Sequence, residues 1–162
     1  EAITIWLGSH DLLRAVGLGR GGPCYPRAGE ADLECLRRMT DQMQEGFDLL
    51  LSEIVALASP AQTLILIAEI GIPPPMVAAW QEDGTFALLK HHAYEVWRDH
   101  LIQAAEKHQV HVVPTYEILN GPAGDLRTPA EYLQPDGIHL NAKGHKLIAD
   151  VHRSVGYEYS SP

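Results

Sequence analysis

The sequence has few basic residues and no long uninterrupted apolar run. Twelve Lys and Arg stand against 21 Asp and Glu, which gives a net charge of -9 at pH 7. This acidic balance argues against a nucleic-acid backbone or an anionic membrane surface as partner, because both attract basic patches. The apolar runs are too short and too often interrupted to span a bilayer, which takes about 20 apolar residues. We therefore expect no nucleic-acid partner and no membrane span.

Cysteine is also scarce. Cys24 and Cys35 are the only two, and their spacing is not the C-x-x-C of redox and metal motifs. A disulfide between them and two free thiols are both compatible with the sequence. The cysteines therefore leave open whether the protein is cytoplasmic or secreted.

The composition is that of a folded α/β chain: the 162 residues are 46% hydrophobic and 20% charged, enough to form a core. Apolar runs predict strands at Ile3 to Leu7, Thr63 to Ala68 and Val110 to Val113. The second run is apolar almost throughout, as in a parallel strand covered on both faces. Apolar residues at three- and four-residue steps predict helices from about Glu30 to Leu57 and from about Phe86 to Lys107.

Segments rich in Gly or Pro separate these elements. Val16 to Gly29 and Asn120 to Pro135 are predicted to be loops, and Ile72 to Pro75 a turn that ends the central strand. Met76 to Trp80 follows the carboxyl end of that strand and is a candidate wall for an acyl or alcohol subsite. Asn141 is a good N-cap for the last predicted helix.

An Asp and a His lie three residues apart just before that helix, in the stretch from Gln134 to His145. A carboxylate on the same short loop can hold Nδ1–H of an imidazole and leave Nε2 free to act as a general base. Asp136 and His139 are therefore a candidate dyad. The alternative is a capping Asp beside a polar loop His.

A second group of polar residues directly follows the first predicted strand. Gly8, Ser9, His10 and Asp11 stand where open α/β sheets place ligand-binding groups. The two motifs, in this order, resemble the SGNH (GDSL-type) hydrolase family. Gly8 to Asp11 matches its third block, G-x-N-D, with His10 in place of Asn, and Asp136 with His139 matches its fifth block, D-x-x-H.

The resemblance implies a flavodoxin-like, three-layer α/β/α fold with a parallel sheet, and hydrolysis of carboxylic esters without metal or cofactor. It assigns the general base to His139 and the orienting carboxylate to Asp136. It places Gly8 and His10 in the oxyanion and substrate-binding part of the site, and makes Asp11 a brace for the loop rather than a group in the chemistry.

The family's first block, G-D-S, and the second block are absent from the sequence. We therefore expect residues 1–162 to be the C-terminal portion of a single SGNH domain that lacks its first two strands. The nucleophilic Ser would come from a missing N-terminal segment or from a second chain, and the strand at Ile3 to Leu7 would be an open edge. The alternative is a non-catalytic SGNH-like module that binds a ligand without turnover.

Ser9 is a weaker candidate for the nucleophile. It follows a strand and Gly8, as a nucleophile elbow would, but G-S-H-D lacks the second glycine of such an elbow. The other histidines are expected to be surface residues rather than metal ligands, because no Cys or carboxylate cluster completes a ligand set.

Overall fold

A parallel sheet forms the centre of the protein. The computed structural model of the chain describes residues 1–17, 21–25, 30–58, 63–82, 84 and 86–156. Within these residues the sheet contains β1 (Ala2–Ile5), β2 (Leu64–Ala68) and β3 (His111–Val113), in the order β1-β2-β3. Both pairings are parallel, with Ile3 opposite Ile65 and Leu66 opposite His111.

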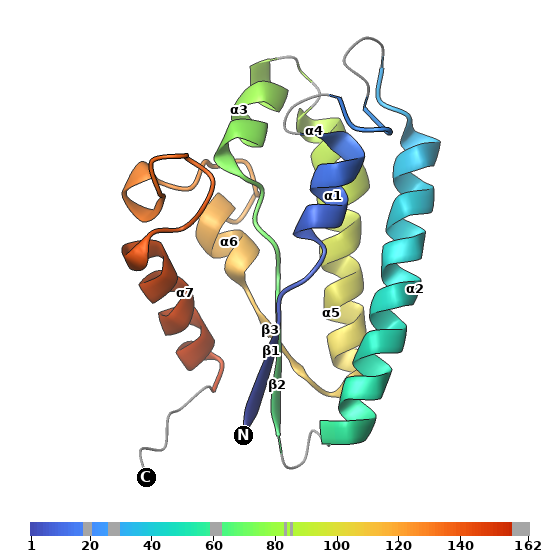
Figure 1. The fold of residues 1–162 in the computed structure, drawn as a ribbon, viewed down its shortest axis with the longest axis vertical. Helices are drawn as coiled ribbons and strands as arrows, with labels where there is room; N and C mark the ends of the chain where they lie inside the picture. Colours follow the sequence, from blue (N-terminus) through green and yellow to red (C-terminus); the bar gives the residue numbers. More distant parts are fainter. Residues whose placement is uncertain (18–20, 26–29, 59–62, 83, 85, 157–162) are drawn as a thin grey trace.

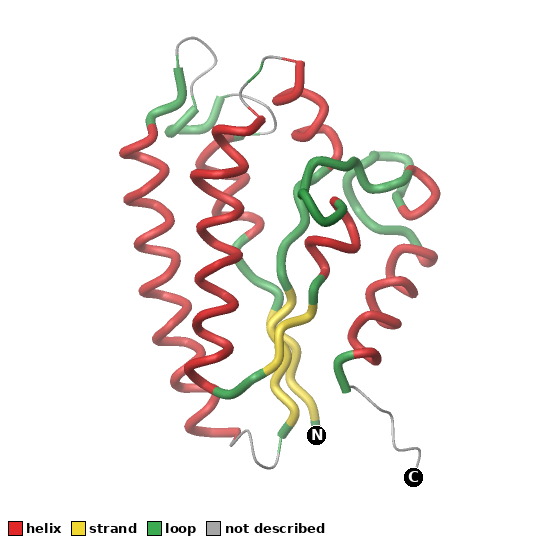
Figure 2. The backbone as a smooth tube through the Cα atoms, turned by 180° about the vertical axis from the view of Figure 1, so that it is seen from behind, coloured by secondary structure: helices red, strands yellow, loops and turns green. Residues whose placement is uncertain are grey.

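Helices cover the sheet on both faces, which confirms the predicted three-layer α/β/α class. Figure 1 shows α2 (Leu33–Ala58) and α5 (Val96–His108) on one face and α7 (Ala142–Ser154) on the other. Figure 2 shows the same layers from behind. Among the described residues β1 has a strand neighbour on one side only, as expected for a flavodoxin-like sheet without its first two strands.

The core is divided by the central strand. Ile65 and Ile67 point into a large cluster beneath α2 and α5, whereas Leu66 and Ala68 belong to a small cluster with Val151 of α7. These four of the five β2 side chains are at most 1% exposed. The apolar run in the sequence thus marks a strand buried on both faces, as predicted.

Several boundaries differ from the prediction. β1 ends at Ile5, and Trp6 and Leu7 are exposed to 41% and 47%. The helix predicted from Phe86 to Lys107 consists of α4 (Phe86–Leu89), the π-helical η1 (Lys90–Glu95) and α5. Helical periodicity alone does not distinguish these helix types.

Three helices were not predicted: α1 (Ser9–Val16), α3 (Pro74–Glu82) and α6 (Thr115–Asn120). α1 begins inside the polar G-S-H-D motif, and α6 is short. α3 begins in a proline run, where proline is tolerated because the first helical N–H groups have no intrahelical partner. The segment predicted as a loop from Asn120 to Pro135 also contains the short 3-10 helix η2 (Ala130–Tyr132).

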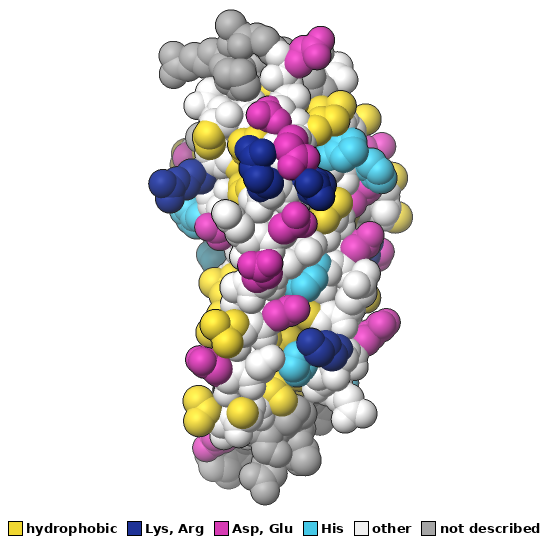
Figure 3. Space-filling view, turned by 90° about the vertical axis from the view of Figure 1, so that its right-hand side faces the viewer, with side chains coloured by type: hydrophobic (Ala, Val, Ile, Leu, Met, Phe, Trp, Pro, Cys, Tyr) yellow, Lys and Arg dark blue, Asp and Glu magenta, His cyan; other side chains and the backbone are white. Residues whose placement is uncertain are grey.

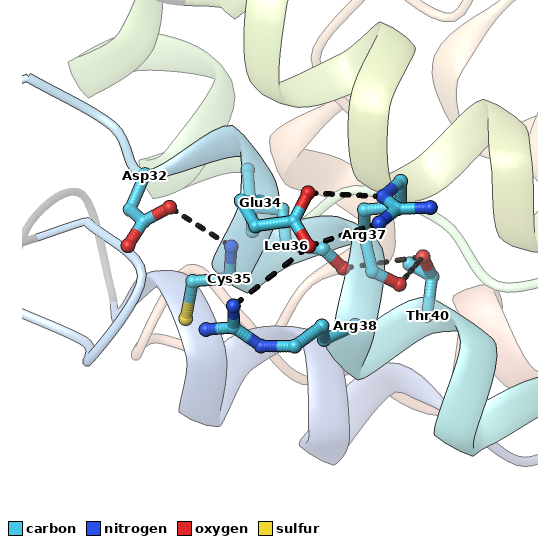
Figure 4. A network of polar contacts seen from close by, with 7 residues as sticks. All are labelled: Asp32, Glu34, Cys35, Leu36, Arg37, Arg38 and Thr40. Carbon is cyan, nitrogen blue, oxygen red and sulfur yellow. Dashed lines mark hydrogen bonds and ion pairs between the residues drawn. The ribbon is translucent and has the colours of Figure 1, made fainter.

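The start of α2 is held by a cap and a disulfide. Asp32 Oδ1 accepts a hydrogen bond from Cys35 N–H at 2.9 Å, and Glu34 pairs with Arg37 one turn further on (Figure 4). Cys35 is bonded to Cys24, 11 residues earlier in the chain. Of the two states that the sequence left open for these cysteines, the structure has the disulfide. It ties the segment after α1 to α2.

Candidate active site

Asp136 and His139 are in direct contact. Asp136 Oδ2 lies 2.7 Å from His139 Nδ1, while Oδ1 accepts from the backbone N–H groups of Ile138 and His139 at 2.9 and 3.0 Å. The hydrogen bond from His139 and those from the two backbone N–H groups lower the pKa of Asp136 to about 2. The ionised carboxylate can only accept, so His139 Nδ1 carries the hydrogen and Nε2 of the neutral ring keeps a free lone pair.

The loop that carries this dyad is closed by its own backbone. Gln134 N–H donates to His139 O at 2.7 Å, and Gly137 N–H donates to Gln134 O at 2.9 Å. Gly137 has φ +70°, a conformation that suits glycine at the tip of this turn. The loop therefore presents His139 outward, with 77% of its side chain exposed.

Asn141 anchors the far end of the loop. Its Oδ1 accepts from Lys143 and Gly144 N–H at 2.8 and 3.1 Å, which is the N-cap that the sequence predicted. Its Nδ2 donates to Glu131 O and Leu133 O, both at 2.9 Å. One side chain thus joins the start of α7 to the chain entering the dyad loop. Asp136 and His139 consequently lie on a braced segment.

The second motif lies where β1 passes into α1. Gly8 caps α1 with φ +103°, and a Cβ at this position would lie 2.4 Å from Trp97 Nε1. Both the backbone conformation and the close indole require glycine here. His10 and Asp11 lie in the first turn of α1 with exposed side chains. Asp11 is thus part of the helix start, where a carboxylate interacts favourably with the helix dipole.

The two motif segments meet at one small pocket. It has a volume of about 110 Å³ and is lined by Trp6 and Ser9 from the first motif region and by Leu140 next to His139. Its remaining walls are Ile70 to Pro74, Leu119 and Thr128. His10 and His139 do not line it. The structure therefore brings together the segments predicted to form one site, while the predicted joint role of the His10 and His139 side chains stays a prediction.

The wall from Ile70 to Pro74 was not predicted. It follows the carboxyl end of β2, where open α/β sheets bind ligands, and that position could have identified it. Met76, which was predicted as a candidate wall, is instead fully buried and accepts a hydrogen bond from Tyr94 Oη at 3.7 Å. The Trp80 side chain lies outside the described residues.

Buried polar side chains hold this wall in place. Asn120 Oδ1 accepts from Ile72 N–H at 2.7 Å, and Asn120 Nδ2 donates to Ile72 O and Leu126 O, both at 3.0 Å. Glu69, just before the wall, accepts from Arg98 Nε at 2.7 Å and from Tyr116 N–H at 3.2 Å. Burial raises the pKa of Glu69, and the hydrogen bond from Arg98 opposes this shift.

A larger groove of about 630 Å³ lies between α1 and α2. Its apolar lining includes Leu7, Met39, Met43 and Leu50, and the Cys24–Cys35 disulfide also borders it. On the face made by α2 and α5, hydrophobic side chains lie among acidic and basic ones (Figure 3).

Neither a metal centre nor a membrane span is visible in the described part of the chain. Its His, Cys, Asp and Glu side chains form no group of three or more that could hold a metal ion. No helix in the same residues is both long and apolar enough to cross a bilayer.

Comparison with known proteins agrees with the motif geometry. The model of the GDSL-like Lipase/Acylhydrolase family matches residues 1–147. No curated protein matches the chain. The crystal structure of LAE5, an alpha/beta hydrolase enzyme from the metagenome of Lake Arreo, Spain, has 20% sequence identity and a TM-score of 0.50. That match covers 95% of this chain and 58% of LAE5, so the chain spans somewhat more than half of that enzyme's length. The family match over both motifs and the shared α/β fold show that this chain belongs to the GDSL-like Lipase/Acylhydrolase family.

Proposed function

We propose that the chain carries the acid–base part of a carboxylic ester hydrolase that acts by Ser-His-Asp acyl transfer. The observation that carries this proposal is the 2.7 Å contact between Asp136 Oδ2 and His139 Nδ1 in a member of this family. The contact fixes the imidazole tautomer and leaves Nε2 as the base. His139 is also exposed, so a substrate and a hydroxyl nucleophile can reach it.

In the proposed reaction His139 Nε2 takes the proton of a Ser hydroxyl while Ser Oγ attacks the ester carbonyl carbon. The imidazolium, stabilised by Asp136, then gives this proton to the alcohol oxygen as the bond from carbon to that oxygen breaks. In the second round His139 takes a proton from the water that attacks the acyl carbon, and gives it to Ser Oγ as the bond from carbon to Oγ breaks and the carboxylic acid leaves. No metal or other cofactor is required by this sequence of steps.

Gly8 and His10 are proposed to contribute to binding of the oxyanion. Both lie at the start of α1, where backbone N–H groups have no intrahelical partner and the helix dipole favours negative charge. His10 stands where the family pattern has Asn, and an imidazole N–H can also donate. Loss of one oxyanion donor typically costs about 3 kcal/mol in the transition state.

We propose that the nucleophilic Ser lies in a polypeptide segment outside the 162 residues, on the same chain or on a second one. Among the residues that the structure describes, β1 pairs with β2 alone, and its other edge supports this proposal. Thr4 is opposite Leu66, so its side chain points to the face of the sheet that α7 covers. On that face Leu66 is buried, whereas Thr4 is exposed. An additional strand and helix would cover both this edge and this exposed face.

The groove beside α2 also supports a missing segment. Parallel strands are joined by right-handed crossovers, and β1 is joined to β2 through α2. Consider a helix that connects an additional strand, lying beyond the free edge of β1, to β1 itself. This connection would run across the sheet in the same direction as the connection from β1 to β2. It would therefore pack on the same face as α2, beside the apolar groove that includes Met43 and Leu50.

The test is ester hydrolysis by the complete polypeptide encoded with these residues, and by residues 1–162 alone. We expect turnover of p-nitrophenyl acetate by the complete protein only, and a loss of at least about 10³-fold in kcat on His139→Ala. His145→Ala is the matched control, because His145 is an exposed histidine on the following helix. A complete protein that binds esters without turnover would favour the non-catalytic binding module.

A further inference from the structure

We infer that the groove between α1 and α2 holds one amphipathic helix from the segment that precedes Glu1. This helix runs parallel to α2 and brings an acidic first turn to Arg14 and Arg38, which both line the groove. The inference rests on the missing segment of the proposed function and adds the direction, the length and the contacts of its helix.

The side of the groove that α2 forms has the spacing of a helix-packing surface. The lining residues recur along α2 at steps of four, three and four, namely Met39, Met43, Gly46 and Leu50. This is the spacing at which one face of a helix contacts another helix. The lining begins at Cys35, 15 positions before Leu50. At 1.5 Å per residue this is about 22 Å, so about four turns of a second helix fit alongside.

Gly46 favours a close approach of that second helix. It lies in the middle of α2, and a Cβ placed on it would meet nothing within 4 Å in the described part of the chain. Those residues therefore give no steric reason for glycine, although glycine in a helix interior is less stable than alanine. A helix that crosses α2 at Gly46 supplies the reason, because the absence of a Cβ lets the two backbones come close.

The direction of the helix follows from the sheet. β1 and β2 are parallel, and α2 leads into β2. A helix on the same face that leads into β1 therefore runs parallel to α2 and begins at the same end, which Figure 1 places far from the N-terminus of β1. Cys35 lies in the first turn of α2, three residues before Arg38. Its disulfide partner Cys24 donates its N–H to Ala15 O at 2.9 Å, which brings the adjacent Arg14 to this end as well.

The charges at this end favour an acidic start of the helix. Asp11 is the one carboxylate among the described lining residues, and Arg14 has no ion pair within the described part of the chain. Arg38 lies 3.8 Å from Glu34, a carboxylate that Arg37 contacts more closely at 2.9 Å. A helix N-terminus carries a partial positive charge, which two arginines would repel. Asp or Glu in the first turn compensates both.

Photo-cross-linking in the complete polypeptide tests which segment lies in the groove. p-Benzoylphenylalanine in place of Gln42, a polar lining residue, should cross-link to a peptide that precedes Glu1 in the same molecule. The same group in place of Glu45, which is exposed and does not line the groove, should give at least about ten-fold less product, because it lies outside contact distance. Equal yields, a product between two molecules, or a product with a segment after Pro162 would overturn the inference.

Thermal unfolding of the complete polypeptide tests the contacts. Gly46→Ala should lower Tm by about 3 °C or more under a close helix, whereas the gain in helix propensity alone would raise Tm by about 2–4 °C. Arg38→Ala should lower Tm more than Arg37→Ala, although Arg37 has the closer ion pair in the described residues. An unchanged or higher Tm for Gly46→Ala, or the reverse order of the two arginine variants, would overturn the inference. Both experiments work without ester hydrolysis, so a lack of turnover would contradict the proposed acyl transfer alone.

Discussion

The Asn120 side chain holds both backbone polar groups of Ile72, a residue 48 positions earlier in the chain, with hydrogen bonds of 2.7 and 3.0 Å. This pair of bonds joins the end of α6 to the wall of the small pocket that Ser9 and Leu140 also line. Asn120 and Ile72 are both fully buried, so the N–H and C=O of Ile72 have no access to water when the Asn120 side chain is removed.

Asn120→Ala is therefore expected to lower the free energy of unfolding by roughly 2–4 kcal/mol, because the buried backbone N–H and C=O of Ile72 lose their partners. Urea unfolding followed by circular dichroism measures this loss. Ile118→Ala, an exposed change on the same helix, should cost less than about 1 kcal/mol. Equal stability of the two variants would show that the Asn120 bonds contribute little.

Stability should also depend on the ionisation of Asp136. Its pKa is lowered from 3.8 to about 2, so the ionised form is favoured in the folded state. The stability that the folded protein gains from ionised Asp136 is fully present above about pH 4 and is lost as the pH falls through about pH 2. Thermal unfolding of the wild type and of Asp136→Asn across this range should give curves that converge towards low pH. A difference in Tm between the two proteins that stays constant with pH would contradict the contact between Asp136 and His139.

His10→Asn tests the departure from the family pattern. If His10 donates to the oxyanion, an Asn with its shorter amide should keep or raise kcat for p-nitrophenyl acetate in the complete protein. His10→Ala should lower kcat by about 10²-fold, with KM changed less. A complete loss of activity in His10→Asn would show that His10 has another role.

Ser9→Ala separates the two possible nucleophiles. Ser9 lines the same pocket as Leu140, so it lies close enough to the dyad loop to be tested. Because we propose a Ser outside the 162 residues, kcat should fall by less than about ten-fold in the complete protein. A loss of about 10³-fold, or Ser9-dependent turnover by residues 1–162 alone, would make Ser9 the nucleophile.

The groove beside α2 should mediate association. Leu50 lines it and is 37% exposed, whereas the adjacent Leu49 is 64% exposed and does not line it. Residues 1–162 alone should self-associate in analytical ultracentrifugation. Leu50→Asp should weaken this association more than the control Leu49→Asp, since it places a charge in an apolar interface. Equal effects of the two variants would show that the groove is not the interface.

The sequence alone determined the features that depend on neighbours along the chain. Asp136 and His139 meet because they lie three positions apart in one turn. Asn141 caps α7 because its side chain reaches the N–H groups two and three residues further on. The β2 run was recognised because a strand buried on both faces must be apolar at every position. Each of these contacts is closed by a short piece of backbone.

Only the tertiary structure decided which distant segments share a site. The pocket joins Ser9, Leu119 and Leu140 from three parts of the chain, and its wall depends on the bonds between Asn120 and Ile72. The disulfide likewise depended on how α1 and α2 pack. Contacts of this kind follow from the packing of whole elements against the sheet, and no local spacing encodes them. The dyad could therefore be read from its motif, whereas the size of the pocket beside it required the fold.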